Sequence, residues 1–250
     1  MFVKLDDSFK EMKDKCKRTY KLGIRQRLIH EVAFPITWLF LHTKITPNQV
    51  TLLWGAIQFF SCFLFLKGNY LGILLALTIY QFAIFLDAVD GHIARYRKIQ
   101  SFTGLFFDQI MHYITIPLMF VCLSIGVAKQ HGSIAWLIVG FAATIIYVYT
   151  KLLTFNPFIY GISNVKDVVD ILDSPDYSLR YSKNKFAVAL FEWFRIEHPF
   201  NILFFTVLFN ISHIGLVVHF LVFSAELLRK VYSQVRQLNK VDKKLRYESH

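Results

Sequence analysis

The fold and the chemistry of this chain are decided by the stretch Asp87-Ala-Val-Asp90-Gly91-His-Ile-Ala94-Arg95, which is followed by Gly104-Leu-Phe-Phe-Asp108 and then by His112. The stretch places three carboxylates at the ends of two very apolar segments. Ionisable groups at the ends of membrane helices usually line a cavity, hold an ion or take part in chemistry. Helical spacing places Asp87 and Asp90 on one face of the first helix. It places Asp108 and His112 on one face of the second. The pattern therefore predicts an oxygen-rich cation site between two adjacent helices.

The composition excludes an ordinary soluble domain. Hydrophobic residues make up 55% and aromatic residues 17% of the 250 residues, and the mean hydropathy is +0.43. Apolar runs occur at residues 50–66, 71–86, 114–128, 134–148, 202–209 and 214–228. Several runs are shorter than the roughly 20 residues that a span needs, but flanking residues complete most of them. We predict an all-α, polytopic membrane protein with six transmembrane helices, of which the 202–209 segment is the weakest.

The distribution of Lys and Arg predicts the orientation. The basic segments are the N-terminal region, the 91–103 loop, the 155–197 connection and the tail from residue 229. Because cytoplasmic loops carry an excess of Lys and Arg, six spans with both termini in the cytoplasm satisfy every loop. The acidic cluster is then expected to face the cytosol.

The chain divides into three expected regions. Residues 1–44 form a cytosolic or interfacial lead-in, in which Leu5, Phe9, Met12, Cys16 and Tyr20 recur at helical spacing. This spacing predicts an amphipathic helix on the membrane surface, with an ordinary solvated helix as the alternative. Residues 45–228 form the transmembrane catalytic domain, and 229–250 a basic cytosolic tail.

Two further segments have expected local structures. Residues 32–43 are apolar but too short to cross a membrane, which favours a re-entrant or interfacial piece. Thr46 and Pro47 fit a helix start, with Thr46 as the cap and Pro47 in the first position. The connection at residues 156–199 is a candidate lid or acceptor-recognition region, with a short surface helix expected at residues 186–195.

The charges and cysteines limit the partners. The formal net charge is +11, but the basic residues cluster beside the spans and not on a separate module. Attraction to anionic lipid and phosphorylated substrates therefore explains the charge better than nucleic-acid binding. Cys16, Cys62 and Cys122 show no pairing or metal-ligand spacing.

The motif resembles the signature of the CDP-alcohol phosphotransferase family, D-x2-D-G-x2-A-R-x8-G-x3-D-x3-D. The residues in register are Asp87, Asp90, Gly91, Ala94, Arg95, Gly104 and Asp108. Such a match arises by chance with a probability below roughly one in a million. The resemblance extends to a six-span layout with a Thr-Pro-Asn-like start, and covers about residues 45–228. The departure is at the last position, where the family has aspartate and this chain has His112.

The resemblance implies a reaction. An alcohol hydroxyl attacks the diphosphate of a CDP-linked donor, forms a phosphodiester and releases CMP, with at least one of the two substrates a lipid. Asp87, Asp90 and Asp108 would hold one or two Mg²⁺ or Mn²⁺ ions. The expected nucleotide- or phosphate-binding residues are Gly91, Ala94, Arg95, Gly104 and Asn48, although Asn48 fits a helix start equally well. Homodimers are common in the resembling family.

His112 is the position on which the function depends. A neutral imidazole beside cations still accepts a proton near neutral pH, so we expect His112 to be the general base, with Asp108 as the other catalytic residue. The alternatives are a structural polar residue or an inactivated site. Two other functions stay open: an inactive CDP-alcohol-binding scaffold, and an ion transporter. A transporter would normally carry its carboxylates near mid-membrane and show repeated halves, and neither feature is visible.

Overall fold

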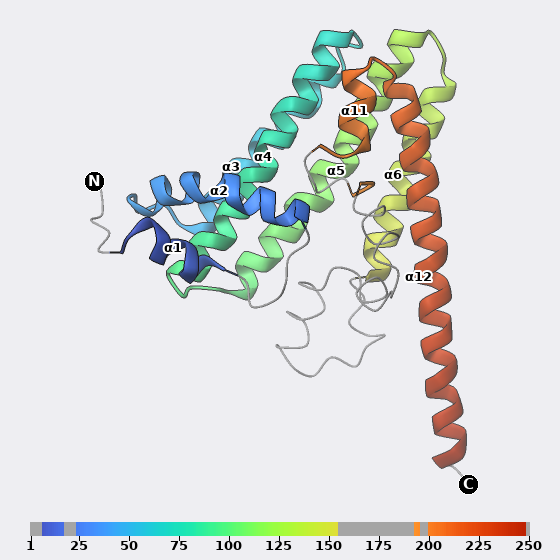
Figure 1. Cartoon of the computed structure of the whole chain (residues 1–250). Helices are drawn as coiled ribbons and strands as arrows, with labels where there is room; N and C mark the ends of the chain where they lie inside the picture. The colour runs from blue at the N-terminus through green and yellow to red at the C-terminus, as the bar shows by residue number, and fades with distance from the viewer. Residues whose placement is uncertain (1–6, 18–23, 155–192, 196–199, 249–250) are drawn as a thin grey trace.

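The protein is described by a computed structural model, in which residues 7–17, 24–154, 193–195 and 200–248 are placed (Figure 1). Within these ranges all regular secondary structure is helical, which confirms the all-α prediction. The helices are α1 (Phe9–Cys16), α2 (Ile24–Leu41), α3 (Pro47–Phe65), α4 (Tyr70–Tyr96), α5 (Phe102–His131), α6 (Ala135–Thr154), α11 (Ile202–Leu208) and α12 (Ser212–Glu248).

Four helices are long and apolar enough to cross a membrane. They are α3, α4, α5 and α6, and they cover the first four apolar runs of the sequence. Their outward faces carry exposed large apolar side chains, such as Phe60 on α3, Leu71 on α4 and Ile138 on α6. Apolar surface of this extent is typical of contact with lipid and not with water. The chain is an integral membrane protein.

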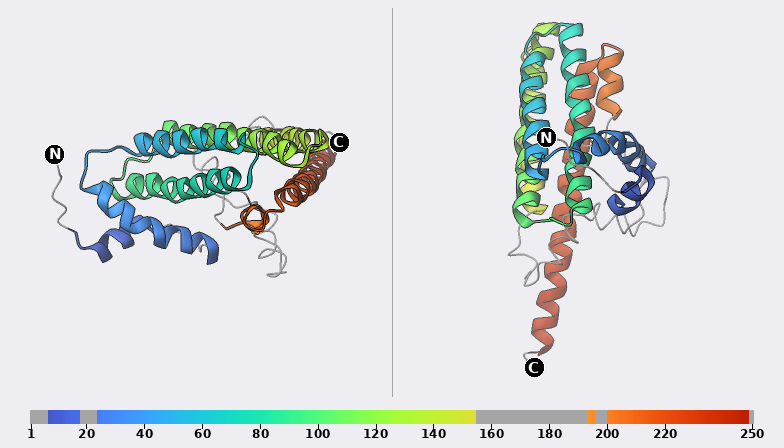
Figure 2. Two further views of the ribbon diagram at one scale, coloured as in Figure 1. Left: turned by 90° about the horizontal axis from the view of Figure 1, so that it is seen from above. Right: turned by 90° about the vertical axis from the view of Figure 1, so that its left-hand side faces the viewer.

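The six-span prediction is not confirmed. Helix α11 has seven residues, about a third of the roughly 20 that a span needs. Helix α12 packs beside α11 and α6 but does not meet the criteria that identify α3–α6 as spans. It runs through the expected boundary at residue 229 as one continuous helix and projects beyond the bundle (Figures 1 and 2). The expected helix at 186–195 lies almost entirely outside the described residues.

The start of α3 has the predicted cap. The Thr46 hydroxyl accepts a hydrogen bond from the Gln49 amide at 3.3 Å, and the Gln49 side chain accepts one from the Thr46 amide at 2.9 Å. Pro47 occupies the first helical position, where its missing N–H has no cost. This cap fixes where α3 begins and so where Asn48 lies.

The N-terminal helices differ from expectation. In α1, Met12 and Cys16 are buried in a cluster with residues of α2, α3 and α4 that includes Phe34, Val50 and Ile93. The expected amphipathic surface helix is therefore not confirmed, because the apolar face of α1 packs on protein; Leu5 and Tyr20 lie outside the described residues. Burial also raises the pKa of the Cys16 thiol to about 11, which keeps it protonated.

The exposed apolar stripe of the lead-in lies on α2 instead. Leu28, Val32 and Leu39 are 60%, 50% and 60% exposed and follow one another along one helix face. Helix α2 includes residues 32–41 of the segment expected to be re-entrant or interfacial, as part of an 18-residue helix with Pro35 inside it. Such a stripe is typical of a helix that lies in the membrane interface. The interfacial placement of the lead-in stays a prediction, and α2 fits it better than α1 does.

The short connection between α4 and α5 positions the site. Arg97, at the end of α4, donates through Nη2 to the Thr43 carbonyl oxygen at 2.8 Å and through Nη1 to that of Ile45. Ser101 caps α5 by accepting a hydrogen bond from the Gly104 amide at 3.0 Å. The connection into α3 and the end of α4 are thereby held together at the end of the bundle where α1 and α2 lie (Figures 1 and 2).

Candidate functional site

The two halves of the motif meet at one end of the bundle. Asp87 and Asp90 lie on the last turns of α4, and Asp108 and His112 on the first turns of α5. The two helices are joined by a short loop, so the end of one lies beside the start of the other (Figure 1). Asp87, Asp108 and His112 therefore converge on a shared point, whereas Asp90 lies apart from that group.

Asp87, Asp108 and His112 form a tight cluster. Each offers one ligand atom, and these atoms all lie within 4.8 Å of one another. His112 Nε2 is 3.7 Å from Asp87 Oδ2 and 3.7 Å from Asp108 Oδ1. The Asp108 Oδ1 atom is buried and has no hydrogen-bond partner among the described residues. A buried oxygen in this state suits a cation, and two carboxylates with an imidazole are ligands that divalent metals accept. The residues fit a divalent metal ion.

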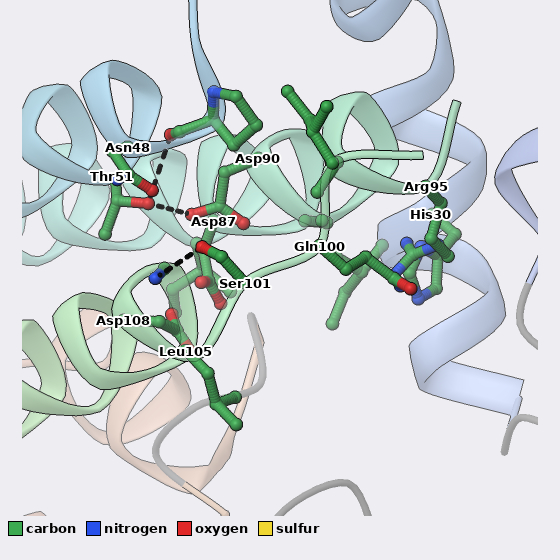
Figure 3. Close-up of a pocket in the computed structure, with 18 of the residues that line it drawn as sticks. His30, Asn48, Thr51, Asp87, Asp90, Arg95, Gln100, Ser101, Leu105 and Asp108 are labelled. Carbon is green, nitrogen blue, oxygen red and sulfur yellow. Dashed lines mark hydrogen bonds between the residues drawn. The ribbon is translucent and has the colours of Figure 1, made fainter. Parts of the chain in front are cut away.

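Asp90 is held separately from this cluster. Its Oδ2 accepts hydrogen bonds from the Thr51 hydroxyl at 2.6 Å and from Trp54 Nε1 at 3.0 Å (Figure 3). Both donors come from α3, so Asp90 connects α4 to a third helix. The two bonds fix the orientation of the carboxylate, which still lines the cavity described next.

A cavity of about 510 Å³ opens over the three aspartates (Figure 3). It is also lined by every residue expected to contact nucleotide or phosphate, namely Asn48, Gly91, Ala94, Arg95 and Gly104. A β-carbon on Gly104 would lie 3.2 Å from the Asn48 side-chain oxygen, so a larger residue there would press on that wall. The volume exceeds what an ion needs and is in the range of small-molecule sites.

Arg95 is oriented by the N-terminal helix. Its Nε donates to the Cys16 carbonyl oxygen, at the end of α1, at 2.7 Å. A β-carbon on Gly91 would lie 3.1 Å from Arg95 Nη1, so the glycine leaves room for the guanidinium along α4. The bond to the Cys16 carbonyl oxygen thus orients the guanidinium, which lines the cavity.

His112 lies apart from the cavity lining. Of the expected site residues it alone is not among those that line the cavity. Its ring packs on Trp54 with centroids 4.9 Å apart and planes tilted by 35°, one turn of α5 beyond Asp108. This position favours a role in which His112 interacts with the two carboxylates. The general-base role stays a prediction.

Sequence reasoning missed the residues that support the motif. Thr51 and Trp54, which hold Asp90, belong to a span that carries no part of the motif. The available signal was their spacing from Asn48, because residues 48 and 51 share a face of α3. Arg97 holds the connection into α3 by donating to two carbonyl oxygens.

Comparison with known families agrees with this site. Residues 44–166 match the model of the CDP-alcohol phosphatidyltransferase family, and all of the motif and the cavity-lining part of α3 fall inside the match. This segment is therefore similar to a CDP-alcohol phosphatidyltransferase domain. No curated protein matches the chain significantly. The match suggests transfer of a phosphate-linked group from a CDP-alcohol, and the cluster of Asp87, Asp108 and His112 fits the divalent metal that the family generally uses.

Proposed function

We propose that this membrane protein transfers a substituted phosphate group from a CDP-alcohol to an acceptor hydroxyl and releases CMP, with Mg²⁺ or Mn²⁺ as cofactor. The observation that carries the proposal is the meeting of Asp87 and Asp108 from two helices at a 510 Å³ cavity inside the matched domain. The cavity has room for more than an ion, which a simple ion-binding site would not need.

Each part of the site has a proposed task. Asp87, Asp90 and Asp108 hold the metal, which when bound neutralises diphosphate charge and acts as a Lewis acid. Arg95, fixed by the Cys16 carbonyl oxygen, is placed to pair with a phosphate. Gly91 and Gly104 keep the cavity walls free of side chains, so that the backbone approaches the nucleotide closely.

For His112 we propose a metal-holding role in place of the base. The support is its 3.7 Å distance to both carboxylates together with its position outside the cavity lining. An imidazole in the place of the family's aspartate removes one negative charge from the site. The remaining carboxylates then neutralise the positive charge of two divalent ions less completely than that of one ion, until the donor's diphosphate binds.

We place the site at the cytoplasmic side with both termini in the cytoplasm, on the distribution of Lys and Arg. At that position the site reaches both lipid and soluble substrates. Either CDP-diacylglycerol donates to a polar alcohol, or a soluble CDP-alcohol donates to a lipid hydroxyl. One of the two substrates is a membrane lipid in either case.

The test is CMP release by the purified protein in lipid nanodiscs with Mg²⁺ or Mn²⁺, across a panel of CDP-alcohol donors and acceptors. We expect release that needs an acceptor and stops with a chelator. Donor binding without CMP release under any condition would contradict the transferase and support an inactive scaffold. Ion flux through liposomes, with neither donor binding nor CMP release, would support the transporter.

A further inference from the structure

A chain of three hydrogen-bonded side chains leads from α2 through α4 to the cavity. The Thr37 hydroxyl lies 2.8 Å from His92 Nδ1, and His92 Nε2 lies 2.6 Å from His30 Nδ1. His92 and Thr37 are fully buried, and the His92 ring stacks on Phe34 with centroids 4.5 Å apart. His30 is partly exposed and lines the cavity. Neither histidine is a specified residue of the family motif.

The hydrogen-bond network fixes the orientation of both rings. The Thr37 hydroxyl donates its one proton to the Ala33 carbonyl oxygen at 2.9 Å, so it accepts from His92 Nδ1–H. This bond and the stacking on Phe34 orient the His92 ring, and the 2.6 Å contact of its Nε2 with His30 Nδ1 then orients His30. The His30 imidazole is therefore held in one orientation at the wall of the cavity.

His30 lies on the opposite side of the aspartates from Asn48, one of the expected nucleotide or phosphate contacts, and on the same side as Arg95, another of them. Figure 3 shows Asn48 and Thr51 on one side of Asp87 and Asp90, and His30 with Arg95 on the other. In displacement at phosphorus, the attacking and leaving oxygens are roughly in line on opposite sides. If CMP leaves toward Asn48, the acceptor alcohol enters from the side of His30.

The chemistry of this end selects one class of alcohol. An imidazole held in one orientation suits a hydroxyl group, which both donates and accepts hydrogen bonds. The guanidinium groups of Arg95 and Arg195 line the same cavity, and they disfavour a cationic head group such as a choline or an ethanolamine. A polyol, with or without its own phosphate, satisfies both conditions.

We infer that His30, oriented through His92 and Thr37, binds a hydroxyl of a polyol acceptor and so determines acceptor specificity. The inference rests on the proposed transferase function. In the reaction the acceptor oxygen forms its bond to the phosphorus bearing the donor's alcohol, the bond from that phosphorus to the CMP oxygen breaks, and the acceptor's proton passes to water.

The experiment measures acceptor kinetics and binding in nanodiscs for His30→Ala, His30→Gln, Thr37→Val and a matched control, His42→Ala. His42 directly follows the end of the same helix, but it is bonded to the Trp38 carbonyl oxygen and does not line the cavity. Acceptors are glycerol, glycerol 3-phosphate, myo-inositol and choline, with CDP-diacylglycerol as donor. Saturation-transfer NMR measures binding of the same four compounds without turnover.

For His30→Ala we expect the KM for the polyols to rise about tenfold, with the donor KM and the metal requirement unchanged. His30→Gln keeps an acceptor atom and should recover part of the loss, Thr37→Val should raise the KM about threefold, and His42→Ala should match wild type. The glycerol and glycerol 3-phosphate arms separate hydroxyl recognition from phosphate recognition.

An unchanged polyol KM in His30→Ala, with CMP release intact, overturns the inference and leaves the proposed function standing. Absence of CMP release by wild type contradicts the proposed function, and the NMR then decides the inference alone. In the NMR experiment, equal binding of choline and the polyols, or no polyol binding, overturns the inference about His30.

Discussion

The two ends of the cavity are built in different ways. At the carboxylate end, residues close in the sequence meet because a short loop joins α4 to α5, and the charged groups cluster within 4.8 Å. At the α2 end, His30 is held by His92, 62 residues away, through neutral hydrogen bonds. The carboxylate end is suited to stabilising charge and the α2 end to recognising a shape and a hydroxyl. Changes at the carboxylate end should lower turnover, and changes at the α2 end should raise the KM for the acceptor.

The largest effect is expected for Asp108→Asn, which keeps the shape but removes a charge from the metal site. Turnover should fall about a thousandfold, since charge stabilisation at the reacting phosphate is a large part of catalysis. CMP release measures it. Asp14→Asn is the matched control, because Asp14 is an exposed carboxylate paired with Lys17 on α1. Retention of a tenth or more of the wild-type rate in Asp108→Asn would break the comparison.

His112 variants sharpen the comparison within the carboxylate end. If His112 holds metal, His112→Ala should raise the Mn²⁺ concentration needed for half-maximal CMP release by about 10- to 100-fold. His112→Asp restores the family's carboxylate and should stay active with a changed metal dependence. A titration of CMP release against Mn²⁺ tests both. If His112→Ala instead lost turnover at saturating Mn²⁺ with an unchanged metal requirement, the result would support His112 as the general base.

A smaller effect is expected for Thr51→Val, which removes the 2.6 Å hydrogen bond to Asp90 and nearly preserves volume. Turnover should fall about tenfold with the acceptor KM little changed. Thr78→Val is the control, because Thr78 is exposed on α4 and bonds only to its own helix at Leu74. If Thr51→Val raised the acceptor KM and spared turnover, the division between the two ends would be wrong.

The smallest effect concerns Asp7, which helps to dock α1 and so to hold Arg95. Hydrogen bonds from Lys15 and Tyr96 lower the pKa of this carboxyl. A carboxyl with a lowered folded-state pKa stabilises the docked state fully above its unfolded pKa, and this contribution is lost as the pH falls below about 4. At neutral pH, Asp7→Asn should modestly speed amide hydrogen exchange at Met12. Equal exchange in both proteins would show that the ion pair adds nothing to docking.

The carboxylate end could be predicted from the sequence because its information is local. Asp87, Asp90, Asp108 and His112 follow helical spacing on two helices joined by a short loop, and all of the expected site residues except His112 line the cavity. The cap at Thr46 was predictable for the same reason, since it depends on four consecutive residues.

The rest depends on tertiary contacts that spacing does not encode. The pairing of His30 with His92 and the two bonds from α3 to Asp90 join residues far apart in the sequence. The apolar pattern of α1 was correct as a helix pattern, but a pattern does not tell whether lipid or protein covers the apolar face. Here Met12 and Cys16 pack on α4 and its neighbours.

One feature of α3 bears on how the protein assembles. Gln58 is buried in the middle of this span, and its side-chain oxygen accepts a hydrogen bond from the Thr115 hydroxyl of α5 at 2.8 Å. Helix α3 also has the lowest hydropathy of the four candidate spans, 1.2. A helix that enters a bilayer with an unpaired amide is penalised until a partner arrives. The Thr115 hydroxyl of α5 supplies that partner, so the contact between α3 and α5 is what allows α3 to carry an amide inside the bilayer.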